Sequence, residues 1–69
     1  MSYSRRKVLR ALELRGVQIV REGGGHTILR GPAGHQSSLP RHSDLNRVTV
    51  RKVAKQLELD WSQMEGDIV

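Results

Sequence analysis

The stretch of residues 17–39 reads VQIVREGGGHTILRGPAGHQSSL and decides the fold. It contains three short runs that favour extended backbone, separated by glycine-rich breaks at 23–25 and 31–34. Such breaks supply the backbone freedom that tight turns need. The runs that we predict to be strands cover residues 17–21, 26–30 and 36–39. Pro40, which cannot donate to a strand ladder, ends the last run, so the stretch predicts a three-stranded antiparallel meander.

Amphipathic helices are predicted on both sides of this meander. Residues 5–15 carry apolar side chains at helical spacing, with Ser4 as the N-cap and Gly16 as the glycine that ends the helix. After the polar segment 42–47, Thr49 is expected to be the N-cap of a second helix. The apolar stripe of this helix consists of Val50, Val53, Ala54 and Leu57.

The last part of the chain, residues 58–69, is acidic, and we expect it to be a tail of a single domain that spans residues 1–69. Within it, Ser62-Gln63-Met64-Glu65 matches a capping box. A last helical turn can therefore start there and place Trp61 or Met64 against the core.

The order α-β-β-β-α puts the chain in the α+β class. A three-stranded antiparallel sheet has an apolar face that must be covered, and two helices packed on that one face can cover it. No further segment is left for the opposite face. We therefore expect that face to meet water or a partner.

The chain is strongly basic. Its 69 residues include 12 Lys+Arg against 7 Asp+Glu, a formal net charge of +5, and most of the cations are arginine. Because arginine can bind phosphate through two N–H groups at once, such a surplus indicates a polyanionic partner, most simply nucleic acid. The sequence contains no cysteine, no membrane-spanning apolar run and no signal peptide, so we expect a soluble cytoplasmic protein.

Histidine is the side chain best suited to catalysis in this sequence. The carboxylates are scattered, no lysine follows the glycines as in a phosphate loop, and we expect neither a metal ion nor another cofactor. RNA carries its own nucleophile, the 2′-hydroxyl. Its cleavage needs proton transfer, which imidazole provides near neutral pH, and cations that stabilise the charged phosphate. A basic domain with one well-placed histidine can therefore be a ribonuclease.

Four elements of the sequence together resemble the HicA family. Residues 21–30, REGGGHTILR, resemble its arginine-ended strand that leads into a glycine-rich turn and a histidine. Leu39-Pro40-Arg41-His42 is similar to its later apolar-Pro-x-His element, and Thr49-Val50-Arg51-Lys52-Val53 to the start of its second helix. Residues 4–16 resemble its first helix. The resemblance covers roughly residues 4–64, nearly the whole chain.

The resemblance implies an RNA interferase, the toxin of a type II toxin–antitoxin system, on a double-stranded-RNA-binding-like fold. His26 would be the catalytic residue, messenger RNA the substrate, and a HicB-type antitoxin protein would cover the site. The residues that we expect to bind RNA are Arg21, Gly24, Gly25, Arg30, Arg41, His42, Arg51, Lys52 and Lys55. Arg21 and Arg30 are expected at the reacting phosphate, and the helix cations at phosphates further along the strand. His26, Ile28 and Arg30 share one face of their predicted strand, so Ile28 is either part of the RNA surface or turned under the helices by strand twist.

Each of these residues also has a purely structural interpretation. His26 can simply cap strand ends in a turn, and His42 can have no role beyond a hydrogen bond to the backbone. His35 is expected at the surface. The cations of the second helix can be a solvated face.

Two other functions also fit the sequence. One is a non-catalytic double-stranded RNA-binding module, because residues 51–55 and 31–35 resemble that family's basic helix start and its Gly-Pro-x-His loop. In that family, however, the loop lies between the first two strands, whereas here it follows the second. The other is a protein-interaction or DNA-binding domain whose histidines have no catalytic role.

Overall fold

The computed structural model describes residues 2–69. In chain order its elements are β1 (Ser2–Ser4), α1 (Arg5–Leu14), β2 (Gln18–Gly23), β3 (His26–Arg30), β4 (Gln36–Pro40), β5 (Asp44–Asn46), α2 (Arg47–Gln56) and α3 (Trp61–Ile68). Strands β2, β3 and β4 form an antiparallel sheet, and β1 pairs with β5 in a separate two-stranded sheet. The predicted α+β class and helix–meander–helix order are confirmed. No helix within residues 2–69 is long and apolar enough to cross a membrane.

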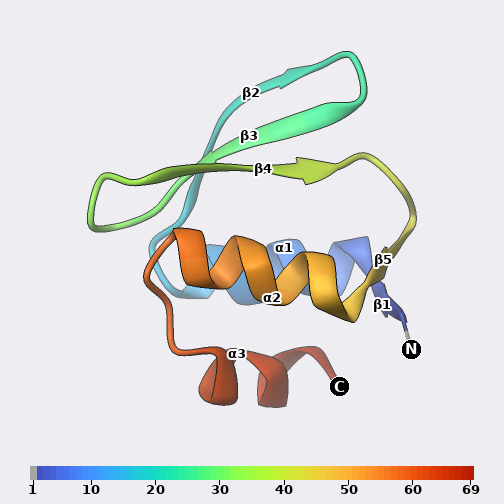
Figure 1. The fold of residues 1–69 in the computed structure, drawn as a ribbon, viewed down its shortest axis with the longest axis vertical. Helices are drawn as coiled ribbons and strands as arrows, with labels where there is room; N and C mark the ends of the chain where they lie inside the picture. Colours follow the sequence, from blue (N-terminus) through green and yellow to red (C-terminus); the bar gives the residue numbers. More distant parts are fainter. Residues whose placement is uncertain (1) are drawn as a thin grey trace.

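The domain is built in layers. Figure 1 shows α1 and α2 between the three-stranded sheet and α3. Along β3 and β4 every second side chain is buried toward the helices, namely Thr27, Leu29, Ser37 and Leu39. The alternate side chains point to the opposite face of the sheet. Within the described residues nothing covers that face, as the sequence predicted.

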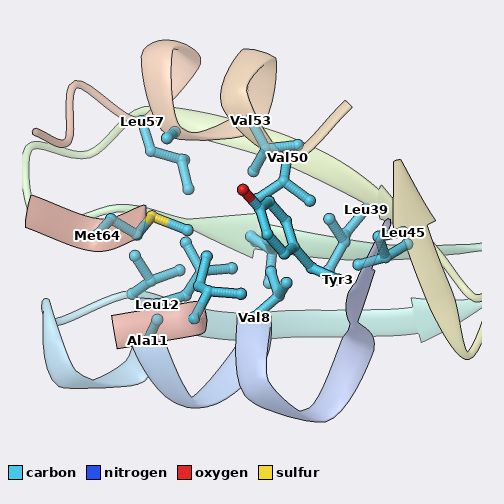
Figure 2. Packing of buried hydrophobic residues seen from close by; sticks show 14 residues of the cluster. Tyr3, Val8, Ala11, Leu12, Leu39, Leu45, Val50, Val53, Leu57 and Met64 are labelled. Atoms are coloured by element: carbon cyan, nitrogen blue, oxygen red, sulfur yellow. The ribbon is translucent and has the colours of Figure 1, made fainter. Parts of the chain in front are cut away.

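The hydrophobic core lies between the sheet and the helices and continues to α3. In Figure 2, Met64 of α3 lies beside Leu12 of α1 and Leu57, the C-cap of α2. These three side chains are at most 1% exposed, and Trp61 packs partly buried against the same cluster. The prediction that Trp61 or Met64 reaches the core is confirmed.

The predicted N-cap of the second helix is wrong. The cap is Asn46, whose side-chain oxygen accepts a 2.8 Å hydrogen bond from the backbone N–H of Val48, and Thr49 lies inside the first turn. The helix starts early because β5 pairs with β1 up to Asn46 and thereby fixes an extended residue just before Arg47. An asparagine in that conformation is a better cap than a threonine two residues into the helix.

The capping box predicted at Ser62 is also wrong. Asp60 is the N-cap of α3 and accepts a hydrogen bond from the N–H of Gln63, so the helix runs for eight residues rather than one turn. Met64 and Ile68 are buried on one side of it. The acidic segment 58–69 is therefore packed on the domain and does not trail away from it as a tail.

The carboxylates of this segment bind cations elsewhere in the domain. Glu65 accepts hydrogen bonds from Arg47 Nε at 2.7 Å and from the Tyr3 hydroxyl at 2.6 Å. Asp67 lies 2.7 Å from Arg15, and Glu58 lies 3.0 Å from His35. Arg47 also lies 5.8 Å from the centroid of the Trp61 ring. These contacts tie α3 to β1, α1 and α2.

We expect the attachment of α3 to weaken in acid. Arg47 first, and then the Tyr3 hydroxyl, lower the pKa of Glu65 below its ordinary value of 4.5. Since the folded pKa is lowered, the contribution of Glu65 to stability is present above 4.5 and is lost as the pH falls through the lowered pKa. Glu65→Gln should therefore be less stable than the wild type in urea at about pH 7, and the difference should shrink in acid. Equal midpoints at about pH 7 would contradict this role.

Candidate active site

The open face of the sheet carries the histidine singled out from the sequence. His26, Ile28 and Arg30 alternate with the buried residues of β3 and so point to this face. The register places Gly23 and Pro40 on either side of His26. Ile28 is therefore part of the exposed surface between the histidine and Arg30, and does not turn under the helices.

A β-bulge in β2 determines which charge accompanies His26. Ile19 pairs with Leu29, but Arg21 pairs with Ile28, so Val20 is an extra residue in the ladder. Because directly paired residues share a sheet face, Arg21 lies on the open face. In a regular ladder Arg21 would pair with buried Thr27 and face the helices. The bulge thus brings a guanidinium to the face that carries His26.

A shallow hollow of about 410 Å³ lies beside His26. Its lining consists of Arg21, Gly23, Gly24, Gly25, His26 and Ile28. A Cβ atom added at any of the three glycines would meet nothing within 4 Å, so they leave the backbone of the turn open to solvent. The positive φ of Gly24, 34°, is tolerated because glycine lacks a Cβ. The hollow offers one imidazole, one guanidinium and exposed backbone.

A polar network lies under the histidine, on the helix-facing side of the strands. Arg5, the first residue of α1, donates to the hydroxyl of Thr27, and this hydroxyl donates to Glu22 at 2.9 Å. Arg5 also donates to Glu22 at 3.4 Å, and Arg41 Nε lies 3.8 Å from the same carboxylate. The Thr27 hydroxyl, followed by the charges of Arg41 and Arg5, lowers the pKa of Glu22. The network fixes the hairpin to the start of α1 directly beside His26.

The glycine turn is held from a second side. The backbone N–H of Arg41, just after β4, donates a 3.0 Å hydrogen bond to the carbonyl of Gly25. The residue that precedes His26 is therefore fixed even though it has no side chain. His42 follows this anchor and is exposed.

We expect Thr27→Val to destabilise the fold by about 1–3 kcal/mol, because it removes the buried hydroxyl that joins Arg5 and Glu22 while keeping the shape of the side chain. Thr27 is 0% exposed. The matched control is Thr49→Val, at a half-buried position in α2. Urea denaturation of both variants checks the prediction. Equal losses for the two would show that the network contributes nothing beyond ordinary β-branched packing.

The structure brings together four of the ten residues predicted for the site: Arg21, Gly24, Gly25 and His26. Arg30 is on the same face, but four residues along the strand place it roughly 13 Å from His26. Arg41 pairs with Glu22 at the edge of the network.

The cations of α2 are not part of the hollow. Arg51, Lys52 and Lys55 are exposed, and the buried side of α2 packs toward the helix-facing side of the sheet, where Ser37 donates to Gln56. They are therefore separated from His26 by the sheet itself.

Sequence reasoning missed the residues that support the histidine. Glu22, Thr27 and Arg5 carry the network, and Gly23 lines the hollow. Ile28, which also lines the hollow, was expected from the strand alternation to share a face with His26 and Arg30. The contact of Arg5 with Thr27 joins segments whose packing no local pattern reveals. Within residues 2–69 no group of three or more His, Cys, Asp or Glu side chains is placed to hold a metal ion.

Comparison with known proteins gives one match. A family model described as HicA toxin of bacterial toxin–antitoxin matches residues 5–59, well over half of the chain. The match takes in the whole three-stranded sheet, α1 and α2, and ends before α3. Searches of curated proteins and of solved structures found no match.

Proposed function

Because the chain belongs to the family of HicA toxins of bacterial toxin–antitoxin systems, we propose that it is a toxin that cleaves messenger RNA with His26 as its catalytic residue. The observation that carries the proposal is the hollow in which His26 and Arg21 meet on an uncovered sheet face. A flat, open, cationic face suits a long polyanion better than a small metabolite, which would need an enclosed pocket.

The proposed reaction uses the RNA's own nucleophile. His26 accepts the proton of a 2′-hydroxyl, the oxygen attacks the adjacent phosphorus, and the bond from phosphorus to the 5′-oxygen breaks. The departing 5′-oxygen takes up a proton from solvent, and His26 later gives its own proton back to solvent. The products are a 2′,3′-cyclic phosphate and a 5′-hydroxyl, so no water is consumed and the balance needs no metal. Arg21 and the open backbone of the glycine turn stabilise the negative charge on the phosphorane. The base that follows can rest on Ile28.

The direct test is cleavage of an RNA oligonucleotide by the purified protein in excess EDTA. We expect cleavage with cyclic-phosphate ends, and none of a DNA or a 2′-O-methyl RNA of the same sequence, because both lack the free 2′-hydroxyl. Salt-sensitive binding to duplex RNA without cleavage would instead select the non-catalytic RNA-binding function. Cleavage of the 2′-O-methyl RNA would overturn the proposed mechanism.

The basic residues should differ in how they affect kinetics. Arg21→Ala should lower the rate at saturating RNA on the order of 100-fold, because Arg21 lines the hollow and acts on the charged transition state. Arg51→Ala should leave that rate nearly unchanged and flatten the salt dependence of binding by about 0.7–0.9 log units per log salt. Arg30→Ala should behave like Arg51→Ala, given its distance from His26. Single-turnover kinetics across a salt series measures both quantities.

A toxin of this kind has an antitoxin as its partner, and we propose a HicB-type protein that carries acidic residues to the open face. The exposed Arg21 and Arg30 and the net charge of +5 favour an acidic partner there. Binding on this face would bury His26 and block RNA. We place both activities in the cytoplasm, where messenger RNA is found.

A further inference from the structure

A second surface lies on the helical side of the domain, away from His26. Two adjoining hollows, of about 370 and 240 Å³, share Lys7, Ile68 and Val69. The first lies between α1 and the end of α3, and its remaining lining consists of Arg10, Ala11, Leu14 and Asp67. The second continues it along β1. We call the two together the α1–α3 groove.

The groove contains apolar surface that the fold itself does not use. Leu14 is 70% exposed and Val69 is 76% exposed, the two highest values among the large exposed hydrophobic residues of the described chain, and both line the first hollow. Single exposed apolar side chains are ordinary on a protein surface. Two beside a hollow whose floor includes Ala11 and Ile68 form a patch of the kind that binds a partner.

Among the described residues, the positive charges along the groove are unpaired, whereas its negative charge is paired. Lys7 and Arg10 have no carboxylate partner within residues 2–69, whereas the one acidic residue of the lining, Asp67, is neutralised by Arg15 at 2.7 Å. The groove therefore presents free positive charge next to apolar side chains. An occupant that complements both must be acidic and amphipathic.

From this geometry we propose that the α1–α3 groove binds an acidic amphipathic helix of a partner protein. A helix fits a groove between two helices, with its apolar stripe against Leu14 and Val69 and its carboxylates toward Lys7 and Arg10. RNA fits less well, because the one aromatic residue that lines the groove, Tyr3, is only 5% exposed and offers no open ring face on which a base can stack. Figure 1 shows α3 on the side of α1 and α2 away from the sheet, so the helix would bind without covering His26. The proposal does not depend on ribonuclease activity.

The test uses a fluorescein-labelled synthetic peptide with leucines at helical spacing and glutamates elsewhere. A length of about 16 residues is enough for a helix to form. We expect it to bind the full chain in the micromolar range, and to shift the backbone amide signals of residues 7–14 and 66–69 in NMR spectra. A peptide with lysine in place of glutamate should not bind.

Matched variants distinguish binding of the peptide in the groove from attraction to the general surface charge of the protein. Leu14→Ser, and the double variant Lys7→Glu with Arg10→Glu, should each weaken binding about tenfold or more. The controls are Arg6→Glu, an exposed cation of α1 outside the groove, and Val48→Ser, an exposed apolar residue of α2. Each control should change affinity by about twofold or less.

Three results would overturn the proposal. The first is no binding of the acidic peptide, and the second is binding that Leu14→Ser leaves unchanged. The third is an RNA oligonucleotide that shifts the amides of residues 7–14 when the peptide does not, which would make the surface a nucleic-acid site. Loss of RNA cleavage in His26→Ala bears on none of these, so the two proposals fail independently.

Discussion

His26→Ala is expected to cleave RNA about 100- to 10,000-fold more slowly than the wild type, the usual contribution of a general acid–base residue. His26 is exposed, so its replacement removes no core packing and the variant should keep the circular dichroism spectrum and urea midpoint of the parent. The large effect is expected because His26 supplies the only imidazole in the lining of the hollow. A folded variant that cleaves at the wild-type rate would exclude His26 as the catalytic residue.

His35→Ala is the matched control for this experiment. His35 is also an exposed histidine, but it lies before β4, where it contacts Glu58 at 3.0 Å. Its replacement should leave cleavage within about twofold of the wild type. An equal loss in both variants would show that the assay reports stability or contamination and not chemistry.

Met64→Ala is expected to destabilise the domain by about 2–5 kcal/mol. Met64 is 0% exposed and fills the space between Leu12 and Leu57, so truncation leaves a cavity where α3 meets both other helices (Figure 2). A small domain has a total stability of only about 5–15 kcal/mol, and the loss should lower the melting temperature by roughly 8 °C or more. Thermal and urea denaturation measure both quantities.

Gln63→Ala is the control, because Gln63 is the exposed neighbour of Met64 on the same helix. It should shift the midpoint by less than about 0.5 kcal/mol. If Met64→Ala were equally mild, Met64 would not be the residue that holds α3 to the core.

The sequence predicted the meander because its determinants are local. Glycine-rich breaks and short β-branched runs place the three strands within two residues of their observed bounds, and β3 matches its predicted range of 26–30. The first helix ends just before Gly16, whose φ of 84° is the left-handed conformation expected of a glycine there. These features need no knowledge of what packs against them.

The errors have a different physical origin. Strands β1 and β5 are three residues each and stabilise one another only across the fold, so neither carries a recognisable pattern. Their pairing moves the cap of α2 from Thr49 to Asn46. The sequence likewise shows Arg51 and Lys55 as cations of the second helix. It does not show that the sheet lies between them and His26. Position in space, and not residue type, decided which cations reach the hollow.

The bulge at Val20 has a consequence for how relatives of this chain can vary in length. Deleting Val20 would leave Ile19 opposite Leu29 and Arg21 opposite Ile28, so the ladder would become regular and every side chain would keep its face. The distance along the chain from α1 to Arg21 can therefore change by one residue. The interval from Arg21 to His26 cannot shorten by one residue, because the turn of Gly24 and Gly25 would then take in Gly23, Glu22 would pair with the histidine, and the guanidinium would turn toward the helices. Among related chains, one-residue deletions should fall before the arginine and not between it and the histidine.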